Sequence, residues 1–274
     1  MLSDRQRWMY FMPYTRQVMC GPESRPDGRL FLIDDRLKPW QKKYHLKQLQ
    51  NQVDETDVVV SISQFTLNAI REHIRVPDSK CQIVYQGSEV KQFPGFDTPS
   101  YKPQRPFLFS IGMLTPKKNF HVLPSLLVGN DYELIIAGRQ HYIKKIEAAA
   151  EEFGVSNRLK LVGGITDEEK YWYYSQCLAF LFPSLAEGLG APVVEAMHFG
   201  KPVFLSDKTS LPEVGGEVAY YFRDFAPDAM QDVFAKGMDH FANNDRTGAI
   251  KQHALQFSWD ANAKAYFDLY RKLY

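Results

Sequence analysis

Short apolar runs alternate with longer amphipathic segments from residue 107 onward. Runs of this length predict buried strands, and the segments between them predict helices. The predicted strands are Phe107–Ile111, Glu133–Ala137, Leu159–Val162, Leu178–Phe182, Pro202–Leu205 and Val218–Phe222. The predicted helices are Phe120–Leu127, Tyr142–Phe153, Thr166–Gln176 and Pro192–Phe199. Strands that alternate with helices in this way form βαβ units, so we predict an α/β fold with a parallel sheet.

Residues at the helix ends support this assignment. Asn119 is placed as an N-cap for the first helix, and Thr166-Asp-Glu-Glu169 matches a capping box that opens the third. Pro192 lies in the first turn of the last helix and Gly200 follows its end, the usual asymmetry of helix termini. Parallel sheets bind ligands beyond the carboxyl ends of their strands, so the loops after the first, fourth and fifth strands are the expected place for a site.

The first hundred residues carry fewer elements. A helix at Tyr44–Thr56 precedes one β-α-β unit, and residues 1–34 have no firm period. The unit consists of Val58–Ile62, Gln64–Arg75 and Gln82–Tyr85. Prolines between residues 94 and 106 indicate a linker. The predicted parts are a partial N-terminal domain over 1–100, a C-terminal domain over 101–258, and a terminal helix over 259–274 that returns toward the N-terminal portion.

Composition is typical of a soluble globular protein. The chain has 274 residues, of which 45% are hydrophobic and 24% are charged, and its formal net charge is +1. This balance gives no strong electrostatic attraction to nucleic acid. Three widely separated cysteines, Cys20, Cys81 and Cys177, argue against a disulfide framework and fit a reducing compartment.

No run approaches the roughly 20 apolar residues that span a bilayer, and the N-terminus has no signal-peptide pattern. The expected location is therefore the cytoplasm. The basic and aromatic stretch Arg5–Met12 is a candidate for peripheral contact with the inner face of the membrane. An irregular edge or a packed first element is the favoured interpretation of this stretch.

A glycine-containing loop lies between the strand that ends at Phe182 and the helix that begins at Pro192. The backbone N–H groups of Gly188, Leu189 and Gly190 can approach an anion closely, and the helix N-terminus adds a favourable partial charge. A phosphate fits there. Glu187 and Glu195 flank this loop and suit hydrogen bonds to sugar hydroxyls. The competing interpretation makes Glu195 a partner of the helix dipole and Glu187 a surface residue.

A second loop, Gly112–Asn119, follows the first strand of the sheet and contains Lys117 and Lys118. Lysines at a helix start suit a diphosphate. A solvated charged turn is the alternative. Because both loops fall at the same end of one predicted sheet, a shared anion site is favoured.

These two loops together resemble family 4 of the retaining glycosyltransferases, which have the GT-B fold. The family pattern E-G-[FL]-G-x-P-x-x-E-A-M is matched from Glu187 to Met197. Its other matched segments are Gly112–Asn119, Gly200–Val203, Ser210–Val214 and Ser258-Trp259. The resemblance covers roughly residues 57–274. It implies a GT-B-like chain with a C-terminal Rossmann-like sheet domain and a shortened N-terminal α/β portion.

The resemblance also implies roles for individual residues. Lys118 would contact the donor phosphates and Glu187 the transferred sugar, so these two are the catalytic candidates. Glu195 would bind the ribose. The remaining donor-binding candidates are Gly112, Lys117, Val162, Ile165, Gly188, Leu189 and Gly190, with Val162 and Ile165 at the base. Met113 departs from members that have Arg there.

The N-terminal part departs further from the family. The stretch Pro26–Asp35 lacks the His that members carry there, and a hundred residues hold too few βα units for a full acceptor domain. His45 and His198 are interpreted as packing residues.

The implied reaction transfers a hexose, with mannose favoured, from a nucleotide diphosphate sugar to a hydroxyl of a glycan or lipid-linked acceptor in polysaccharide or lipopolysaccharide biosynthesis. GDP-mannose is the favoured donor and a UDP-sugar the alternative. The chain has no D-x-D motif, so no essential metal and no cofactor are expected. The alternative function is a truncated, inactive protein that binds nucleotide sugars or partners. A Rossmann dehydrogenase is disfavoured because no G-x-G-x-x-G opens a helix.

Overall fold

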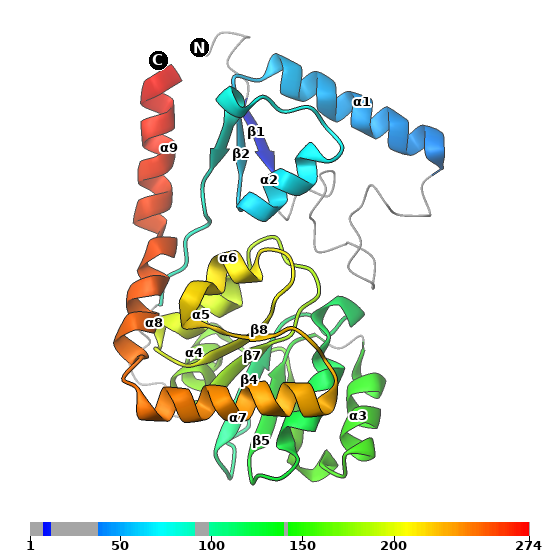
Figure 1. Cartoon of the computed structure of the whole chain (residues 1–274), viewed down its shortest axis with the longest axis vertical. Helices are drawn as coiled ribbons and strands as arrows, with labels where there is room; N and C mark the ends of the chain where they lie inside the picture. The colour runs from blue at the N-terminus through cyan, green and yellow to red at the C-terminus, as the bar shows by residue number, and fades with distance from the viewer. Residues whose placement is uncertain (1–7, 12–37, 91–98, 140–141, 274) are drawn as a thin grey trace.

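The computed structural model describes residues 8–11, 38–90, 99–139 and 142–273 (Figure 1). Within these ranges the chain forms a three-stranded sheet near the N-terminus and a six-stranded sheet in the C-terminal part. Every strand pair in both sheets is parallel. The prediction of an α/β fold with a parallel sheet is therefore confirmed.

The larger sheet has the order β6-β5-β4-β7-β8-β9. Its strands are β4 (Phe107–Ile111), β5 (Glu133–Ala137), β6 (Leu159–Gly163), β7 (Ala179–Phe182), β8 (Val203–Ser206) and β9 (Tyr220–Phe222). The first strand of this sheet, β4, lies in its centre. The strands β5 and β6 follow on one side of β4, and β7 pairs with its other side. The direction of the strand order reverses between β4 and β7, which is where open α/β sheets bind ligands.

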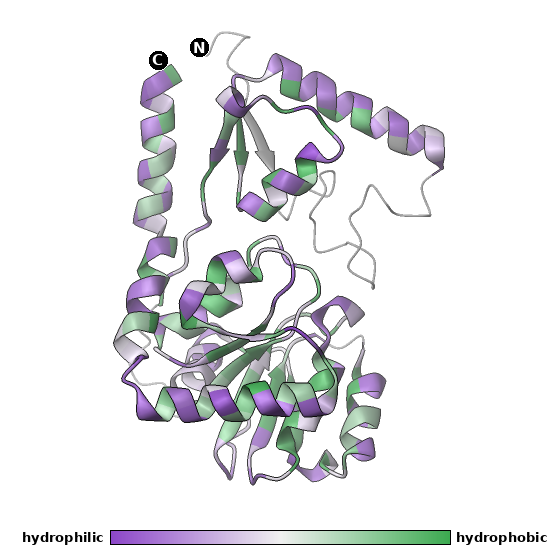
Figure 2. Cartoon of the chain, viewed as in Figure 1, coloured by the Kyte–Doolittle hydropathy of each residue, from purple (hydrophilic) through white to green (hydrophobic). Residues whose placement is uncertain are grey.

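Helices cover both faces of this sheet, so its strands are apolar on both sides. One face packs against α4 (Asp167–Gln176), α5 (Ala191–His198), α6 (Leu211–Gly215) and α8 (Thr247–Ala254). The other face packs against α3 (Ile143–Glu152), α7 (Pro227–Asn243) and the 3-10 helix η4 (Phe120–Leu127). Successive residues of β4 alternate between these cores: Phe107 and Phe109 join the first, and Leu108 joins the second. Figure 2 shows hydrophobic strands enclosed by helices whose outer faces are hydrophilic.

The structure confirms the helix predicted at Phe120–Leu127 and corrects the role predicted for Asn119. The helix is a 3-10 helix, and Pro124 within it lacks the N–H that an α-helix would use. Asn119 precedes η4 but its side chain makes no capping hydrogen bond. Its backbone instead takes a left-handed conformation with φ of 58°, which Asn tolerates better than most residues. The capping box of α4 is present, with both bonds between Thr166 and Glu169 formed.

The N-terminal sheet has the order β1-β2-β3, made of Trp8–Phe11, Val58–Ser61 and Cys81–Ile83. Its helices are α1 (Pro39–Glu55) and α2 (Gln64–Arg71). The first begins earlier than predicted because Pro39 fits a first helical turn. The described part of the stretch 5–12 is β1, which pairs with β2 in the parallel sheet. The stretch 26–35, which lacks the His expected from the family, lies outside the described residues.

The last helix, α9 (Trp259–Leu273), runs back alongside the N-terminal sheet (Figure 1). Leu269 packs there against Val60 and Val84. Near its start, the Asn262 side-chain amide donates to the carbonyl of Tyr85 at 2.7 Å. A side chain at Gly87 would meet Trp259 at 2.5 Å, so glycine is required where the chain crosses this helix. The C-terminal helix α9 is thus packed against the N-terminal sheet.

Candidate functional site

The two predicted loops lie at the point where the strand order reverses. Leu108 and Phe109 of β4 pair with Ala179 and Phe180 of β7, so the two parallel strands end at the same edge. The loop that begins at Gly112 therefore lies beside the loop that precedes α5. The N–H of Leu185 donates to the carbonyl of Lys117 at 2.7 Å and joins the loops directly.

Lys118 and Glu187 form an ion pair across these loops. The Nζ atom of Lys118 lies 2.5 Å from Oε1 of Glu187, and the two side chains are only 11% and 12% exposed. Lys118 also lies 4.6 Å from the centre of the Phe182 ring, and the Ser184 hydroxyl donates to Glu187 Oε1 at 2.6 Å. The cation and carboxylate that the sequence singled out are therefore in direct contact and shielded from water.

Lys117 and Glu187 do not occupy a solvated surface. Lys117 is a buried residue, with 6% of its area exposed. The N–H of Glu187 donates to the Thr209 hydroxyl at 3.0 Å, and the Ser210 hydroxyl donates to the carbonyls of Glu187 and Leu189, both at 3.2 Å. Three hydroxyl side chains, counting Ser184, thus fix this loop. Sequence reasoning missed all three, although two of them, Thr209 and Ser210, follow β8 at the expected edge of the sheet.

Glycine is required at the start of α5. Gly190 has φ of 96°, and a Cβ there would lie 2.8 Å from the Leu211 side chain. The chain therefore turns into the helix through a backbone that only glycine adopts easily.

The lysine loop contains buried polar atoms that have no partner. Within the part of the chain that the structure describes, Thr115 Oγ1 and Asn119 Nδ2 are buried and make no hydrogen bond. Buried polar groups are nearly always paired, so these two atoms are exceptions within the lysine loop.

Glu195 lies in α5 and has partners of its own, separate from the Lys118–Glu187 pair. Its Oε1 atom is 3.2 Å from Lys170 Nζ, and its Oε2 atom accepts from the Tyr174 hydroxyl at 3.0 Å. Burial opposes the charge of Lys170, but the carboxylates of Glu195 and Asp167 outweigh burial and raise the pKa of Lys170. Burial and Glu195 together raise the pKa of Tyr174 well above its ordinary value.

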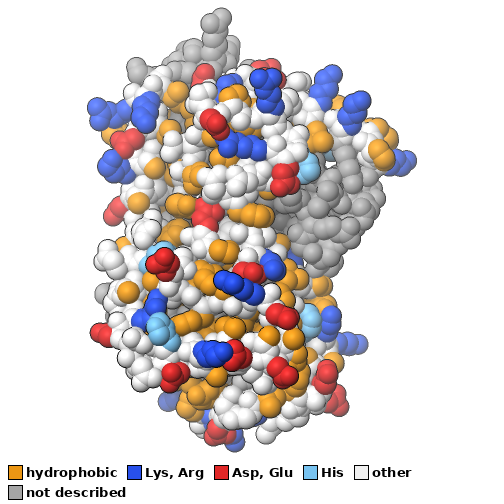
Figure 3. Space-filling model, in the orientation of Figure 1, with side chains coloured by type: hydrophobic (Ala, Val, Ile, Leu, Met, Phe, Trp, Pro, Cys, Tyr) orange, Lys and Arg blue, Asp and Glu red, His pale blue; other side chains and the backbone are white. Residues whose placement is uncertain are grey.

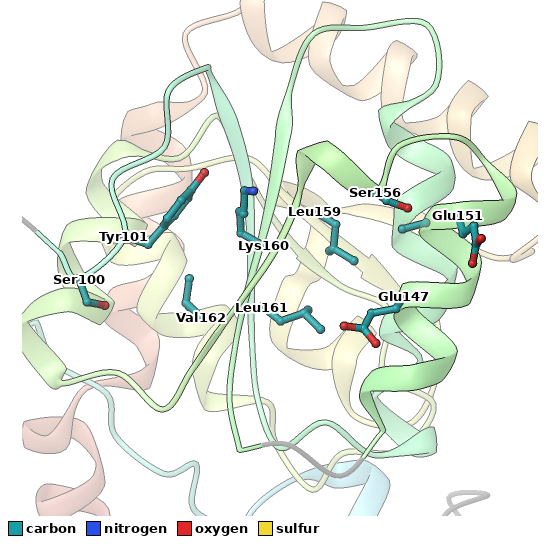
Figure 4. Close-up of a pocket in the computed structure, with 10 residues that line it drawn as sticks. Ser100, Tyr101, Glu147, Glu151, Ser156, Leu159, Lys160, Leu161 and Val162 are labelled. Atoms are coloured by element: carbon teal, nitrogen blue, oxygen red, sulfur yellow. The ribbon is translucent and has the colours of Figure 1, made fainter.

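Val162 and Ile165 are half-buried against the core near the end of β6. Val162 also lines an open pocket of about 540 Å³, which lies along the outer edge of β6 (Figure 4). Tyr101 and Lys160 lie on one side of that strand, and Glu147 and Glu151 project from α3 on the other. None of the Lys118, Glu187 or Glu195 side chains lines this pocket, so it is distinct from the site between the loops.

Comparison with known proteins identifies the family of the chain. The model of glycosyl transferases group 1 matches residues 97–250, more than half of the chain. The chain belongs to the group 1 glycosyltransferases. The matched residues contain both loops and every predicted donor-site residue, from Gly112 to Glu195.

The relatives of this glycosyltransferase include bacterial mannosyltransferases. It is 27% identical over 259 residues to the serotype-specific mannosyltransferase WbdA of Escherichia coli, covering 85% of the chain and 31% of WbdA. It is 24% identical over 259 residues to O-antigen chain mannosyltransferase B of the same organism, covering 89% and 65%. The chain thus spans less than two thirds of the length of these relatives.

Solved structures support the GT-B-like fold of this glycosyltransferase. Anabaena Alr3699/HepE in complex with UDP and glucose superimposes with a TM-score of 0.69 at 17% identity, covering 88% of this chain and 69% of that one. The sucrose-phosphate synthase of Thermosynechococcus elongatus gives a TM-score of 0.69 at 19% identity, covering 84% and 62%. These similarities establish the fold class predicted from the sequence, a GT-B-like α/β chain with a Rossmann-like parallel sheet.

Two described histidines, His198 and His45, contact neighbouring groups of this glycosyltransferase. His198 Nε2 lies 3.2 Å from the carbonyl of Ser88, and burial lowers the pKa of His198. His45 on α1 stands edge-on to Tyr44, with ring centroids 5.8 Å apart. Among the described residues, no group of three His, Cys, Asp or Glu side chains is placed to hold a metal, and no helix is both long and apolar enough to cross a bilayer.

Proposed function

We propose that this chain binds a nucleotide diphosphate sugar at the β4–β7 reversal point and transfers its hexose to a hydroxyl acceptor with retained configuration. The Lys118–Glu187 pair carries the proposal. A cation for phosphate and a carboxylate for sugar hydroxyls stand together at the edge where α/β sheets bind nucleotides. Membership in the group 1 family supports the same reaction.

In the proposed complex, Lys118 contacts the donor phosphates, and the backbone of Gly188, Leu189 and Gly190 adds N–H donors at the start of α5. Glu187 accepts hydrogen bonds from hydroxyls of the transferred sugar, and Glu195 accepts hydrogen bonds from hydroxyls of the ribose. Gly112 and Lys117 complete the phosphate side. Val162 and Ile165 flank the base.

The proposed chemistry needs little more than charge stabilisation. The bond between the sugar C1 and the phosphate oxygen breaks, and the acceptor oxygen bonds to C1 on the same face. The departing phosphate takes the acceptor proton. Negative charge grows on the diphosphate as it leaves, and Lys118 with the loop N–H groups stabilises that charge. We therefore assign the chain to the metal-independent retaining family 4, with no cofactor.

The identity of the donor rests on the relatives. WbdA, O-antigen chain mannosyltransferase B and RfbU of Salmonella typhimurium are all named as mannosyltransferases. We therefore favour GDP-mannose and an acceptor glycan of polysaccharide or lipopolysaccharide synthesis. The HepE structure contains UDP and glucose, which keeps a UDP-sugar as the alternative donor.

The test combines binding with transfer. Calorimetric titration with GDP and UDP measures nucleotide affinity, and radiolabelled mannose transfer from GDP-mannose to a mannan acceptor measures turnover. Glu187→Ala should abolish transfer and leave the fold intact, although loss of the nearly buried ion pair with Lys118 lowers the melting temperature. Glu147→Ala, on α3 away from the two loops, is the matched control. Unchanged turnover in Glu187→Ala removes Glu187 from the mechanism, and failure of both nucleotides to bind overturns the proposal.

A non-catalytic binding protein is the second candidate. The observation that favours it is the absence of His from residues 26–35, where the resembled family carries one. Nucleotide binding without transfer to any supplied glycan acceptor would support this candidate over the first.

A membrane-bound acceptor would bring the chain to the cytoplasmic face of a membrane, and one helix face suits such contact. Trp40 and Tyr44 on α1 are 65% and 56% exposed. With the exposed Lys43 and Lys47 they share a helical face, and no acidic residue occurs from Lys38 to Val53. Figure 3 shows charges of both signs interspersed over the rest of the visible face. Trp40→Ala/Tyr44→Ala should lose co-sedimentation with anionic vesicles, whereas equal sedimentation of the variant would contradict this contact.

A further inference from the structure

The carboxylate of Glu195 is held from the neighbouring helix α4. Lys170 and Tyr174 are four residues apart, so both face α5 from the same side of α4. Lys170 donates to Oε1 of Glu195 at 3.2 Å and Tyr174 donates to Oε2 at 3.0 Å. The Lys170 and Glu195 side chains are 16% and 19% exposed. Each carboxylate oxygen therefore has one fixed donor and keeps further acceptor capacity.

The charges around Glu195 favour a neutral hydroxyl ligand over a phosphate. Lys170 also forms an ion pair with Asp167 at 2.9 Å. The Lys170 ammonium group lies 4.7 Å from the centre of the Tyr171 ring. Asp167, Lys170 and Glu195 together carry a formal charge of −1, so this cluster does not attract an anion. Its free acceptor positions fit the donors of a vicinal diol.

We infer that Lys170 and Tyr174 are positioning residues that orient the Glu195 carboxylate to accept both hydroxyls of a nucleotide ribose. The inference rests on the proposed donor function and extends it to residues outside the two loops. Without Lys170, the Glu195 side chain can rotate away from the diol. Without Tyr174, it loses the bond that fixes the plane of the carboxylate.

A purely structural role makes a different prediction. If Lys170 only joined α4 to α5, its removal would weaken binding of every nucleotide equally. A positioning role concerns the ribose hydroxyls alone. The two roles are separated by asking whether removal of Lys170 and removal of the hydroxyls have independent effects, as in a double-mutant cycle.

In the experiment, GDP and 2′,3′-dideoxy-GDP are titrated into the full chain by calorimetry. The titrations are repeated with UDP and 2′,3′-dideoxy-UDP. Wild-type protein should bind the ribose form about tenfold or more tightly than the dideoxy form, because two hydrogen bonds to a charged acceptor are lost. In Lys170→Met the preference should fall below about threefold, and Lys170→Arg should restore it. Tyr174→Phe should show an intermediate preference.

Lys236→Met is the matched control, because Lys236 forms an exposed ion pair with Asp232 at 2.8 Å on α7. This variant should keep the wild-type preference. An undiminished preference in Lys170→Met overturns the inference, as does equal binding of the two forms by the wild type. Failure of the wild type to bind either nucleotide pair overturns the proposed donor function instead, so the two failures are distinguishable.

Discussion

Glu213 on α6 accepts a hydrogen bond from the Tyr85 hydroxyl at 2.7 Å. The same carboxylate accepts the backbone N–H groups of Gln64 and Phe65, at 2.7 and 3.2 Å. These N–H groups belong to the first turn of α2, where a helix has no internal acceptors and its dipole favours a negative charge. The C-terminal part thus supplies the anion that caps a helix of the N-terminal portion.

Glu213→Ala should loosen this contact between the two parts. The variant leaves two helix N–H groups and the Tyr85 hydroxyl without their acceptor, which should lower the free energy of unfolding by about 1–2 kcal/mol. Urea denaturation measures the loss, and hydrogen exchange should accelerate at the amides of Gln64 and Phe65. Glu217→Ala, an exposed residue nearby, is the control. Equal exchange at both amides in Glu213→Ala and wild type would refute the cap.

A second substitution at Glu187 should restore the stability that a substitution of Lys118 removes, but it should not restore transfer. Lys118→Met leaves a nearly buried carboxylate without its cation and should cost about 1–3 kcal/mol of unfolding free energy. Adding Glu187→Gln removes the stranded charge and should recover most of that loss. Transfer should stay reduced by about 10²-fold or more in both variants, because no cation meets the leaving diphosphate. Additive losses of stability in the double variant would show that the ion pair contributes no coupling.

The strands β4 and β5 of the larger sheet were predictable because each is a short, mostly apolar run followed by a glycine. Phe107–Ile111 and Glu133–Ala137 match their predicted bounds, and Gly112 and Gly138 follow them. A Cβ at Gly138 would lie 1.8 Å from the carbonyl oxygen of Gly112. Glycine is therefore needed at Gly138, because the segments that follow β4 and β5 are in close contact there. The side-by-side position of the two loops follows from parallel pairing, which the alternation of strands and helices indicated.

Other features depend on contacts between distant residues. Lys170 and Glu195 are 25 positions apart on different helices, and the pattern of α4 alone does not reveal which of its faces meets α5. The α7 helix carries a readable signal that was missed, since Met230, Phe234 and Gly237 recur at helical spacing and are buried. The strand β1 pairs with β2, which lies about 50 residues further along the chain, so no local pattern predicts this pairing.

A buried tyrosine, Tyr173, and a half-buried one, Tyr221, should make the fold sensitive to alkaline pH. Burial raises the pKa of Tyr173 to about 12, and burial raises the pKa of Tyr221 to about 12 as well. The folded state therefore holds protons that the unfolded chain releases near pH 10, so stability is complete below pH 10 and is lost as pH rises toward 12. Urea midpoints measured from pH 8 to 11 should be level up to about pH 9.5 and then fall. A rising midpoint would contradict this assignment.

Thr209 combines backbone strain with a contact to the proposed catalytic carboxylate. Its φ of 55° is unfavourable for a β-branched residue, and its hydroxyl accepts the N–H of Glu187 at 3.0 Å. Thr209→Gly relieves the strain, so its unfolding free energy should stay within about 1 kcal/mol of the wild type or exceed it. Transfer should nevertheless fall about tenfold, because the loop that carries Glu187 loses one hydrogen bond of about 1 kcal/mol and the precision it gives.

Thr209→Ser keeps the hydroxyl and should retain most of the wild-type rate, so the pair of variants separates the acceptor from the backbone. Melting temperatures and initial rates of transfer measured on both variants decide the matter. A stable Thr209→Gly protein with wild-type turnover would mean that the Thr209 hydroxyl does not position Glu187. A loss of rate confined to Thr209→Gly would instead place this strained residue in the support of the site, where strain persists because the surrounding contacts require it.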